Sequence, residues 1–230
     1  MEEIIFGNKA SDQIKKTPMY QGLSLLNDYL EAQNAPEMTF YIVGGFAMIA
    51  QGLRDGGVTD IDYVGADLPK DIAKELDRIG LSLDMGAGWV NNDLMLSGSS
   101  IKDLEISTGK LHFTKTADIG RVHMKFLDEK DLLRMKVLAV DTSLSAVELG
   151  GDFTRLKDLP DIARMMEARN LDMLGLEMET FQYCIADNTY LLIEDFLKHH
   201  DLEMSAEKAD ELTGQTDRFN IENLIPKFEL

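Results

Sequence analysis

The stretch from Tyr41 to Gly65, YIVGGFAMIAQGLRDGGVTDIDYVG, constrains the fold more than any other part of this chain. A β-branched and aromatic run ends at a glycine pair, a short amphipathic segment follows, and a second strand-like run carries two aspartates. This order predicts a strand, a turn into a helix, and a return strand. Because side chains alternate along a strand, we expect Asp60 and Asp62 on one face.

Two like charges on one face repel each other, so the aspartate pair predicts a bound cation. Mg²⁺ takes oxygen ligands and uses one or two carboxylates together with substrate phosphates, and two such ions can clamp the attacking and leaving oxygens. Gly44 and Gly45 at the turn would let the backbone approach a phosphate at the helix N-terminus. Taken alone, the pattern also fits a simple turn followed by a solvated strand face.

The sequence of this stretch resembles that of a known superfamily. Val43-Gly44-Gly45 and Asp60-Ile61-Asp62-Tyr63 resemble the signature of the nucleotidyltransferases related to DNA polymerase beta, although the RDGG loop is slightly long. Bacterial nucleotidyltransferase-like proteins allied to the abortive-infection type IV toxins look similar in three further segments, GWVNND, FLDEKDLLRMKVLA and RLKDLPDIARM. The resemblance runs in the same order from Phe40 to Met166 and leaves both ends of the chain uncovered.

The resemblance implies roles for individual residues. It implies that Asp60 and Asp62 bind Mg²⁺, with two ions possible. It also implies a nucleotide-binding set, which consists of Gly44, Gly45, Thr59 and Lys136. A third acid is usual in the superfamily, and the alternation in IKDLEIS places Asp103 and Glu105 on one face. Either could serve, with Glu105 preferred because it lies mid-strand; an outward polar face and the use of a later aspartate remain open.

Lys136 is also singled out by helical periodicity. The predicted helix over 130–140 has a broad apolar arc, and Lys136 falls in its middle while Arg134 lies opposite. A lysine in that position must pair with a carboxylate or reach a phosphate, because an unpaired buried charge is costly. The alternative is that its stem covers the edge of the core while its head reaches water. In the toxins that the chain resembles, a lysine in the same Met-Lys context takes part in nucleotide chemistry.

Asp158 matches the Lys-Asp motif of the same proteins, with Lys157 before it, and could act as a catalytic acid. Pro160 favours a first helical turn, so Asp158 could instead be the N-cap of the following helix. Both roles are compatible only if one carboxylate oxygen stays available. Asp161 falls on the polar side of this helix and is treated as secondary.

Periodicity predicts an α/β (α+β) fold with a nucleotidyltransferase-like mixed sheet over 1–127 and a helical region over 128–230 packed on it. Four strands are expected, at 38–43, 58–64, 101–107 and 121–127. Eight helices are expected, at 17–34, 46–53, 71–79, 130–140, 159–168, 177–185, 190–198 and 205–212. Asp128 is expected to cap the fourth of these helices, with Asp131 in its first turn.

Composition limits the partners. With 41 acidic against 23 basic residues, the chain has a formal net charge of -18, which disfavours broad DNA binding and anionic membranes. The single cysteine, Cys184, excludes an intrachain disulfide and is expected to be buried in FQYCIAD. The beginning of the chain lacks a signal-peptide pattern, and no apolar run has transmembrane length, so a cytoplasmic protein is expected.

Together these features predict an NTP-binding, Mg²⁺-dependent nucleotidyltransferase. By resemblance, it would transfer a nucleoside monophosphate to a tRNA end or a protein hydroxyl, within a toxin–antitoxin or phage-defence system and with a cognate antitoxin as partner. The main alternative is a catalytically inactive nucleotide-binding or protein-interaction module of the same fold. A third interpretation is a helical scaffold in which the sheet has only a structural role.

Overall fold

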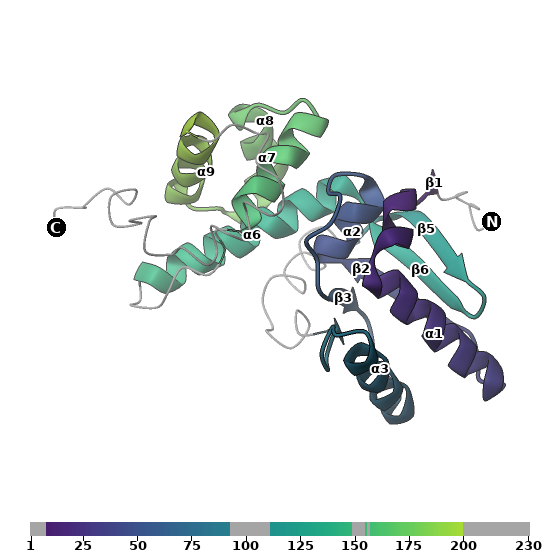
Figure 1. Cartoon of the computed structure of the whole chain (residues 1–230). Coiled ribbons are helices and arrows are strands. Elements are labelled where there is room, and N and C mark those ends of the chain that lie inside the picture. Colours follow the sequence, from purple (N-terminus) through teal and green to yellow (C-terminus); the bar gives the residue numbers. More distant parts are fainter. Residues whose placement is uncertain (1–7, 93–110, 149–154, 156, 200–230) are drawn as a thin grey trace. The chain divides into compact units, whose positions relative to one another are not determined.

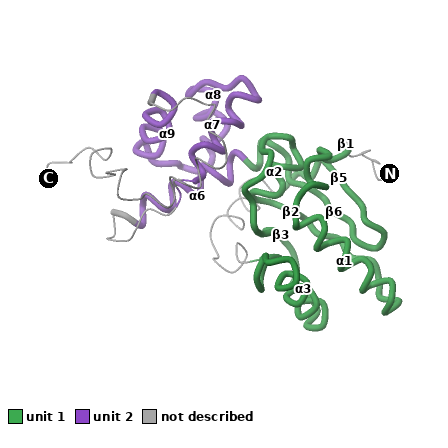
Figure 2. The backbone as a smooth tube through the Cα atoms, in the orientation of Figure 1, with its two compact units in different colours: residues 1–132 green, residues 133–230 purple. Residues whose placement is uncertain are grey.

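The computed structural model describes residues 8–92, 111–148, 155 and 157–199. Over these residues the protein has an α+β fold, which confirms the predicted class: a mixed sheet with helices, followed by helices alone (Figure 1). The chain divides into two compact units, residues 1–132 and 133–230 (Figure 2). This division falls inside helix α6 (Glu129–Glu148), whereas the sequence had suggested a boundary at residue 127.

The described strands of unit 1 form one six-stranded sheet in the order β1-β5-β6-β2-β3-β4. Their bounds are Asn8–Lys9 for β1, Met38–Val43 for β2, Ile61–Val64 for β3, Val90–Asn91 for β4, Phe113–Ile119 for β5 and Val122–Leu127 for β6. The β5–β6 and β2–β3 pairs are antiparallel, while β1–β5, β6–β2 and β3–β4 are parallel. The stretch from Tyr41 to Gly65 therefore begins near the middle of the sheet, on β2.

One face of this sheet forms the core of unit 1. In the parallel register Phe40 lies opposite Met124 and Ile42 opposite Phe126, and all four side chains are buried. On the other face Lys125 lies over the ring of Tyr41, 5.2 Å from its centroid. The strand predicted at 121–127 is thus confirmed as β6, with Val122, Met124 and Phe126 buried.

The described residues of unit 1 include the helices α1 (Pro18–Ala32), α2 (Gly44–Gln51) and α3 (Lys70–Ser82), preceded by a 3-10 turn, η1 (Asp12–Lys16). The Thr17 hydroxyl caps α1, and Pro18 occupies its first turn, where no N–H is needed. The α1 helix contacts β5, β6 and α3, while α2 contacts β2, β3 and β6. Trp89 is buried, and its Nε1 donates to the Leu76 carbonyl at 2.7 Å.

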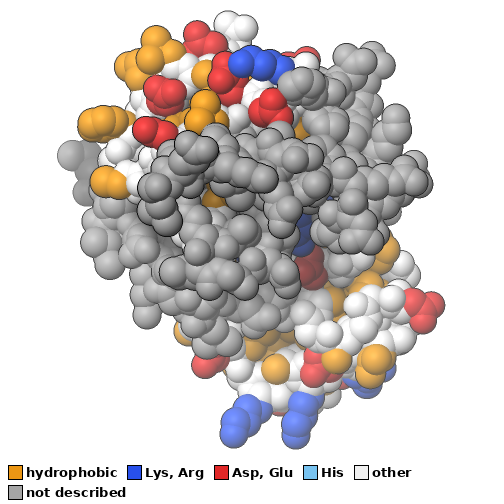
Figure 3. All heavy atoms as spheres, turned by 90° about the vertical axis from the view of Figure 1, so that its left-hand side faces the viewer, with side chains coloured by type: hydrophobic (Ala, Val, Ile, Leu, Met, Phe, Trp, Pro, Cys, Tyr) orange, Lys and Arg blue, Asp and Glu red, His pale blue; other side chains and the backbone are white. Residues whose placement is uncertain are grey.

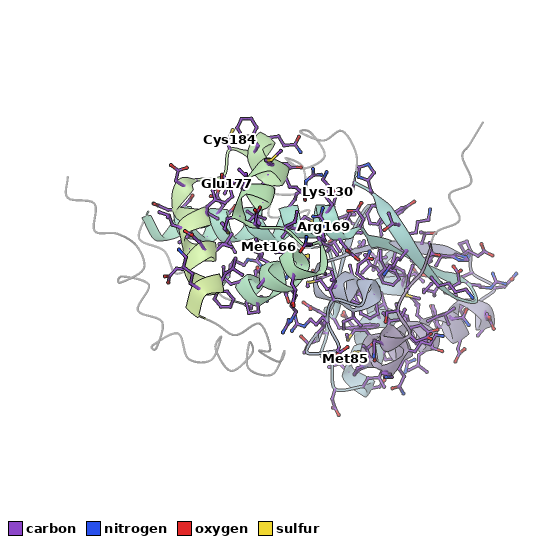
Figure 4. The ribbon with its side chains drawn as sticks, turned by 90° about the horizontal axis from the view of Figure 1, so that it is seen from above. Met85, Lys130, Met166, Arg169, Glu177 and Cys184 are labelled. Carbon is purple, nitrogen blue, oxygen red and sulfur yellow. The ribbon has the colours of Figure 1, made fainter. Side chains whose placement is uncertain are left out.

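The described part of unit 2 contains the rest of α6 with α7 (Asp158–Ala168), α8 (Met173–Thr180), the 3-10 turn η2 (Phe181–Tyr183) and α9 (Asp187–His199). The Asp141 carboxylate on α6 accepts from the Ala186 N–H and the Thr189 hydroxyl, which ties α6 to the first turn of α9. Arg169, labelled in Figure 4, donates to Glu179 at 2.6 Å and so joins the end of α7 to α8. Among the described helices, none is both long and apolar enough to cross a membrane.

Several sequence predictions need correction. The helix predicted at 177–185 begins four positions earlier, as α8, and gives way to η2, after which Cys184 adopts a left-handed φ of 52°. Cys184 is exposed rather than buried. Strand β5 was missed because its side chains do not alternate clearly between buried and exposed. The predicted strand 101–107 and the helix 205–212 lie outside the described residues.

Candidate functional site

The structure brings the two halves of the predicted motif into contact at Gly44 and Asp62. Strands β2 and β3 pair so that Val43 lies opposite Asp62, and Gly44 follows directly as the first residue of α2. A Cβ at Gly44 would lie 2.3 Å from Asp62 Oδ2, closer than any real contact allows. Gly44 also has a φ of +65°. Both the turn and the aspartate therefore require glycine at this position.

The N-terminus of α2 points to the same place. Its N-cap is Val43, whose apolar side chain provides no capping hydrogen bond. A carboxylate or phosphate at this end interacts favourably with the helix dipole and the first backbone N–H groups. The half-buried Asp62 carboxylate, which lies against Gly44, already occupies part of this position. Gly45 is less constrained, since a Cβ there would lie 3.0 Å from Val58 Cγ2.

Asp60 and Thr59 lie just outside the strand. The structure begins β3 at Ile61, so the predicted strand 58–64 is shorter than expected. The reason is the pairing: β2 turns into α2 after Val43, and β4 starts opposite Ile61, so neither neighbour continues alongside Asp60. Asp60 and Thr59 are exposed, while Asp62 is half-buried. The predicted third acid, Glu105, and its alternative Asp103 lie outside the described residues.

Lys136 lies in unit 2 and is held by two carboxylates. Its Nζ is 2.5 Å from Asp158 Oδ1 and 2.8 Å from Asp161 Oδ2, and its side chain is only 13% exposed. Lys136 projects from α6, whereas both aspartates come from the first turn of α7. The interpretation that Lys136 snorkels to water over the core edge is therefore wrong. The prediction that it must be paired is confirmed for a carboxylate partner.

The structure also corrects the predicted N-cap role of Asp158 and the predicted polar position of Asp161. The α7 helix begins at Asp158 with Lys157 as its N-cap, so Asp158 is not the cap. Asp161 is 1% exposed and does not lie on a polar face. The two aspartates are three positions apart and therefore share one helix face, which is directed at Lys136. Two arginines add ion pairs: Arg155 lies 3.6 Å from Asp158, and Arg164 lies 3.3 Å from Asp161.

The electrostatics of this cluster fix the charge of Lys136. Burial disfavours the ammonium, but the Asp158 and Asp161 carboxylates outweigh it and raise the pKa of Lys136 well above its usual range. Lys136 is therefore a permanent cation at neutral pH and cannot act as a general base. Asp158 Oδ2 is buried and accepts no hydrogen bond within the described part of the chain, and the Arg155 guanidinium lies 3.6 Å from it.

A third cluster, which sequence reasoning missed, lies where the β5–β6 hairpin meets α6. His112, Asp128 and Asp131 each offer a ligand atom within 4.8 Å of the others. Buried Asp131 accepts from the His112 backbone N–H at 3.0 Å and contacts His112 Nδ1 at 2.9 Å. Asp128 caps the first turn, as predicted, by accepting the Asp131 N–H at 2.8 Å. These contacts give the cluster a structural role at the start of α6. The hairpin register, which pairs Phe113 with Leu127, is the signal that could have found it.

The predicted site residues thus fall into two groups. Gly44, Gly45, Thr59, Asp60 and Asp62 belong to unit 1, and Lys136 and Asp158 belong to unit 2. Comparison with protein-family models, with curated proteins and with solved structures finds no match for this chain. The function is therefore argued from the residues and their contacts.

Proposed function

We propose that this protein binds an NTP with Mg²⁺ and transfers a nucleoside monophosphate to an RNA (tRNA) or protein hydroxyl. The contact between Gly44 and Asp62 carries the proposal. Two segments that are separated in sequence meet there, and only glycine leaves room for the carboxylate beside the N-terminus of α2. A glycine turn, a helix N-terminus and an aspartate beside it suit a metal-bound triphosphate.

The donor set fits magnesium. Asp62 and Asp60 offer hard carboxylate oxygens from β3 and the residue before it, and Mg²⁺ prefers oxygen ligands shared with substrate phosphates. The ion would neutralise charge on the phosphoryl oxygens. The backbone at Gly44 and Gly45 would bind the phosphates, with Thr59 exposed beside Asp60 as a further donor.

In the proposed reaction the acceptor hydroxyl oxygen forms a bond to the α-phosphorus, and the bond from that phosphorus to the bridging oxygen breaks, which releases pyrophosphate. The hydroxyl proton passes to a carboxylate. The resemblance offers Asp158 and Glu105 as the two candidates for this base. Lys136, which forms an ion pair with Asp158, would orient this carboxylate.

Incubation with each α-labelled NTP, Mg²⁺, total tRNA and cell extract tests this proposal. We expect a labelled RNA or protein product with the wild type and none with Asp62→Asn. Asp28→Asn, which removes an exposed acid from α1, is the charge-matched control and should leave labelling unchanged. A product that persists in Asp62→Asn would overturn the assignment of the site. Growth arrest on expression, abolished by the same substitution, would support a toxin role and justify a search for a neighbouring antitoxin.

A specific observation also favours the alternative of an inactive nucleotide-binding or interaction module. Two buried carboxylates already bind Lys136, so the cation has partners without any nucleotide. Such a module would bind Mg²⁺ and NTP without transferring label. Binding without a labelled product, under any acceptor tested, distinguishes it from the enzyme.

A further inference from the structure

Unit 2 contains a groove that the proposed chemistry does not use. It has a volume of about 860 Å³ and lies between α8, η2 and α9. Its apolar lining includes Phe181, Leu191 and Ile185. Glu177 and Cys184, both labelled in Figure 4, also line this groove. Every lining residue lies within unit 2, so the groove is a property of this unit alone.

An exposed apolar stripe borders this groove. Leu174, Met178 and Phe181 follow one another at i, i+4 and i+7, and so share one side of α8 and η2. Met178 is 74% exposed and Phe181 84% exposed. Large apolar side chains that gather on a surface beside a groove are typical of a protein-interaction site. Figure 3 shows hydrophobic and acidic side chains next to one another near the top of the view, where unit 2 is seen.

The charge around the groove is of one sign. Among the described residues, its lining includes the acidic residues Glu177, Asp187 and Glu194 and no lysine or arginine. Glu194 is paired at 2.8 Å with Lys198, whose side chain is exposed. The pKa of Tyr190, which also lines the groove, is raised by burial and further by the charges of Glu177, Asp141 and Asp187. The groove is therefore lined by both apolar and acidic side chains.

We propose that this groove binds a basic amphipathic segment of a partner protein, with apolar side chains against Phe181 and Leu191 and Lys or Arg side chains beside the acidic rim. A helix laid in an apolar groove is a common recognition mode, and complementary charge selects the partner. A second copy of this chain fits poorly, because its net charge of -18 would oppose the acidic rim. The chain's own residues 200–230 fit poorly too, since they carry eight acidic and three basic residues.

Titration of the full chain into a fluorescent 18-residue Leu/Lys amphipathic peptide tests the proposal by anisotropy. We expect saturable binding that weakens with added salt, and no binding of the same peptide with Glu in place of every Lys. Phe181→Ser should weaken binding about tenfold or more, because exposed aromatic anchors dominate such interfaces. Leu81→Ser removes a similarly exposed apolar side chain from α3 in unit 1 and should leave binding unchanged.

The charge contribution is tested separately. Glu177→Gln with Glu194→Gln should weaken binding and reduce its salt dependence, whereas Glu167→Gln, an exposed acid on α7, should do neither. Equal binding of the Leu/Glu peptide, or no effect of Phe181→Ser, would overturn the proposal. Tighter binding of a synthetic peptide of residues 213–230, or a dimer that Phe181→Ser dissolves, would also overturn it by assigning the groove to this chain's own sequence.

Discussion

Gly44 is constrained at the scale of a single residue by two independent features, its positive φ and its contact with Asp62. Gly44→Ala should lower the free energy of unfolding by the strain of a positive φ, about 1–2 kcal/mol, and by a further 1 kcal/mol or more, roughly, for the clash. Gly52→Ala is the matched control, because Gly52 has a φ of +80° and no atom near its missing Cβ. Chemical denaturation measures both.

The clash itself can be isolated with Asp62→Ala. If the carboxylate is the obstacle, Gly44→Ala should cost less in the Asp62→Ala background, by about the difference between the Gly44 and Gly52 substitutions. Equal costs in both backgrounds would show that Asp62 does not lie against Gly44. That result would separate the two halves of the proposed site.

Lys136 offers a second residue-scale prediction. Replacing it with methionine removes the lysine partner of the buried carboxylates Asp158 and Asp161. The free energy of unfolding should therefore fall by about 3–5 kcal/mol. Lys130→Met changes an exposed lysine on the same helix, labelled in Figure 4, and should stay within about 0.5 kcal/mol of wild type. A small effect of Lys136→Met, similar to that of Lys130→Met, would contradict the buried ion-pair cluster.

The raised pKa of Lys136 has a defined sign for stability. A group whose pKa is higher in the folded state stabilises fully at pH values below its unfolded pKa, here near 10.5, and this contribution disappears only as the pH rises through the folded value. The contribution of Lys136 is therefore constant around neutral pH. Loss of activity in Lys136 variants has to be compared with their stability before a role in chemistry is assigned.

At the scale of elements, the β5–β6 hairpin carries a histidine, His123, whose pKa is raised by its carboxylate neighbours. His123 Nδ1 lies 2.7 Å from Asp118 across the hairpin, and its Nε2 lies 3.3 Å from Glu37. The hydrogen bond with Asp118 outweighs partial burial and, with the charges of Asp118 and Glu37, raises the pKa of His123 above its ordinary value of 6.5.

His123 should therefore titrate above pH 6.5 by NMR, and Asp118→Asn should lower its midpoint. Since the folded pKa is raised, the stabilisation is fully present below pH 6.5 and is lost as the pH rises through the folded value. Thermal melts of the wild type should show this decline, and melts of His123→Gln should lack it. An unchanged His123 midpoint in Asp118→Asn would contradict the pairing.

Elements that depend on local pattern were predictable from the sequence, and those that depend on partners were not. The strand Met38–Val43 and the short helix after it follow from β-branched residues and from apolar spacing. The start of β3 at Ile61 is set by where β2 ends and β4 begins, which residues 58–60 do not reveal. Asp161 was assigned to a polar face because its counter-charge, Lys136, comes from a different helix.

The same distinction separates the features of the candidate site that were predictable from the sequence from those that were not. The glycine pair and the aspartates were recognisable in sequence, and the contact of Gly44 with Asp62 follows from the turn and the register between their strands. The burial of Lys136 was predicted from its place in an apolar arc. The groove beside Phe181 was not, because helix α8 begins earlier than its periodicity indicated and its apolar stripe faces outward.

For the whole molecule, the formal net charge of -18 opposes the proposed binding of a triphosphate. An acidic protein repels a triphosphate, so the proposed site needs a divalent cation to offset both the phosphates and the Asp60 and Asp62 carboxylates. NTP binding should accordingly depend on Mg²⁺. The same charge argues for recognition of a single acceptor end rather than of a long nucleic acid.

Isothermal titration of the full chain with each NTP, with and without Mg²⁺, tests the central claim that the Gly44–Asp62 turn is a metal–triphosphate site. We predict saturable binding of at least one NTP that requires Mg²⁺, that is lost in both Gly44→Ala and Asp62→Asn, and that is retained in Asp28→Asn. Absence of binding by every NTP, or equal binding by the wild type and Asp62→Asn, would contradict it.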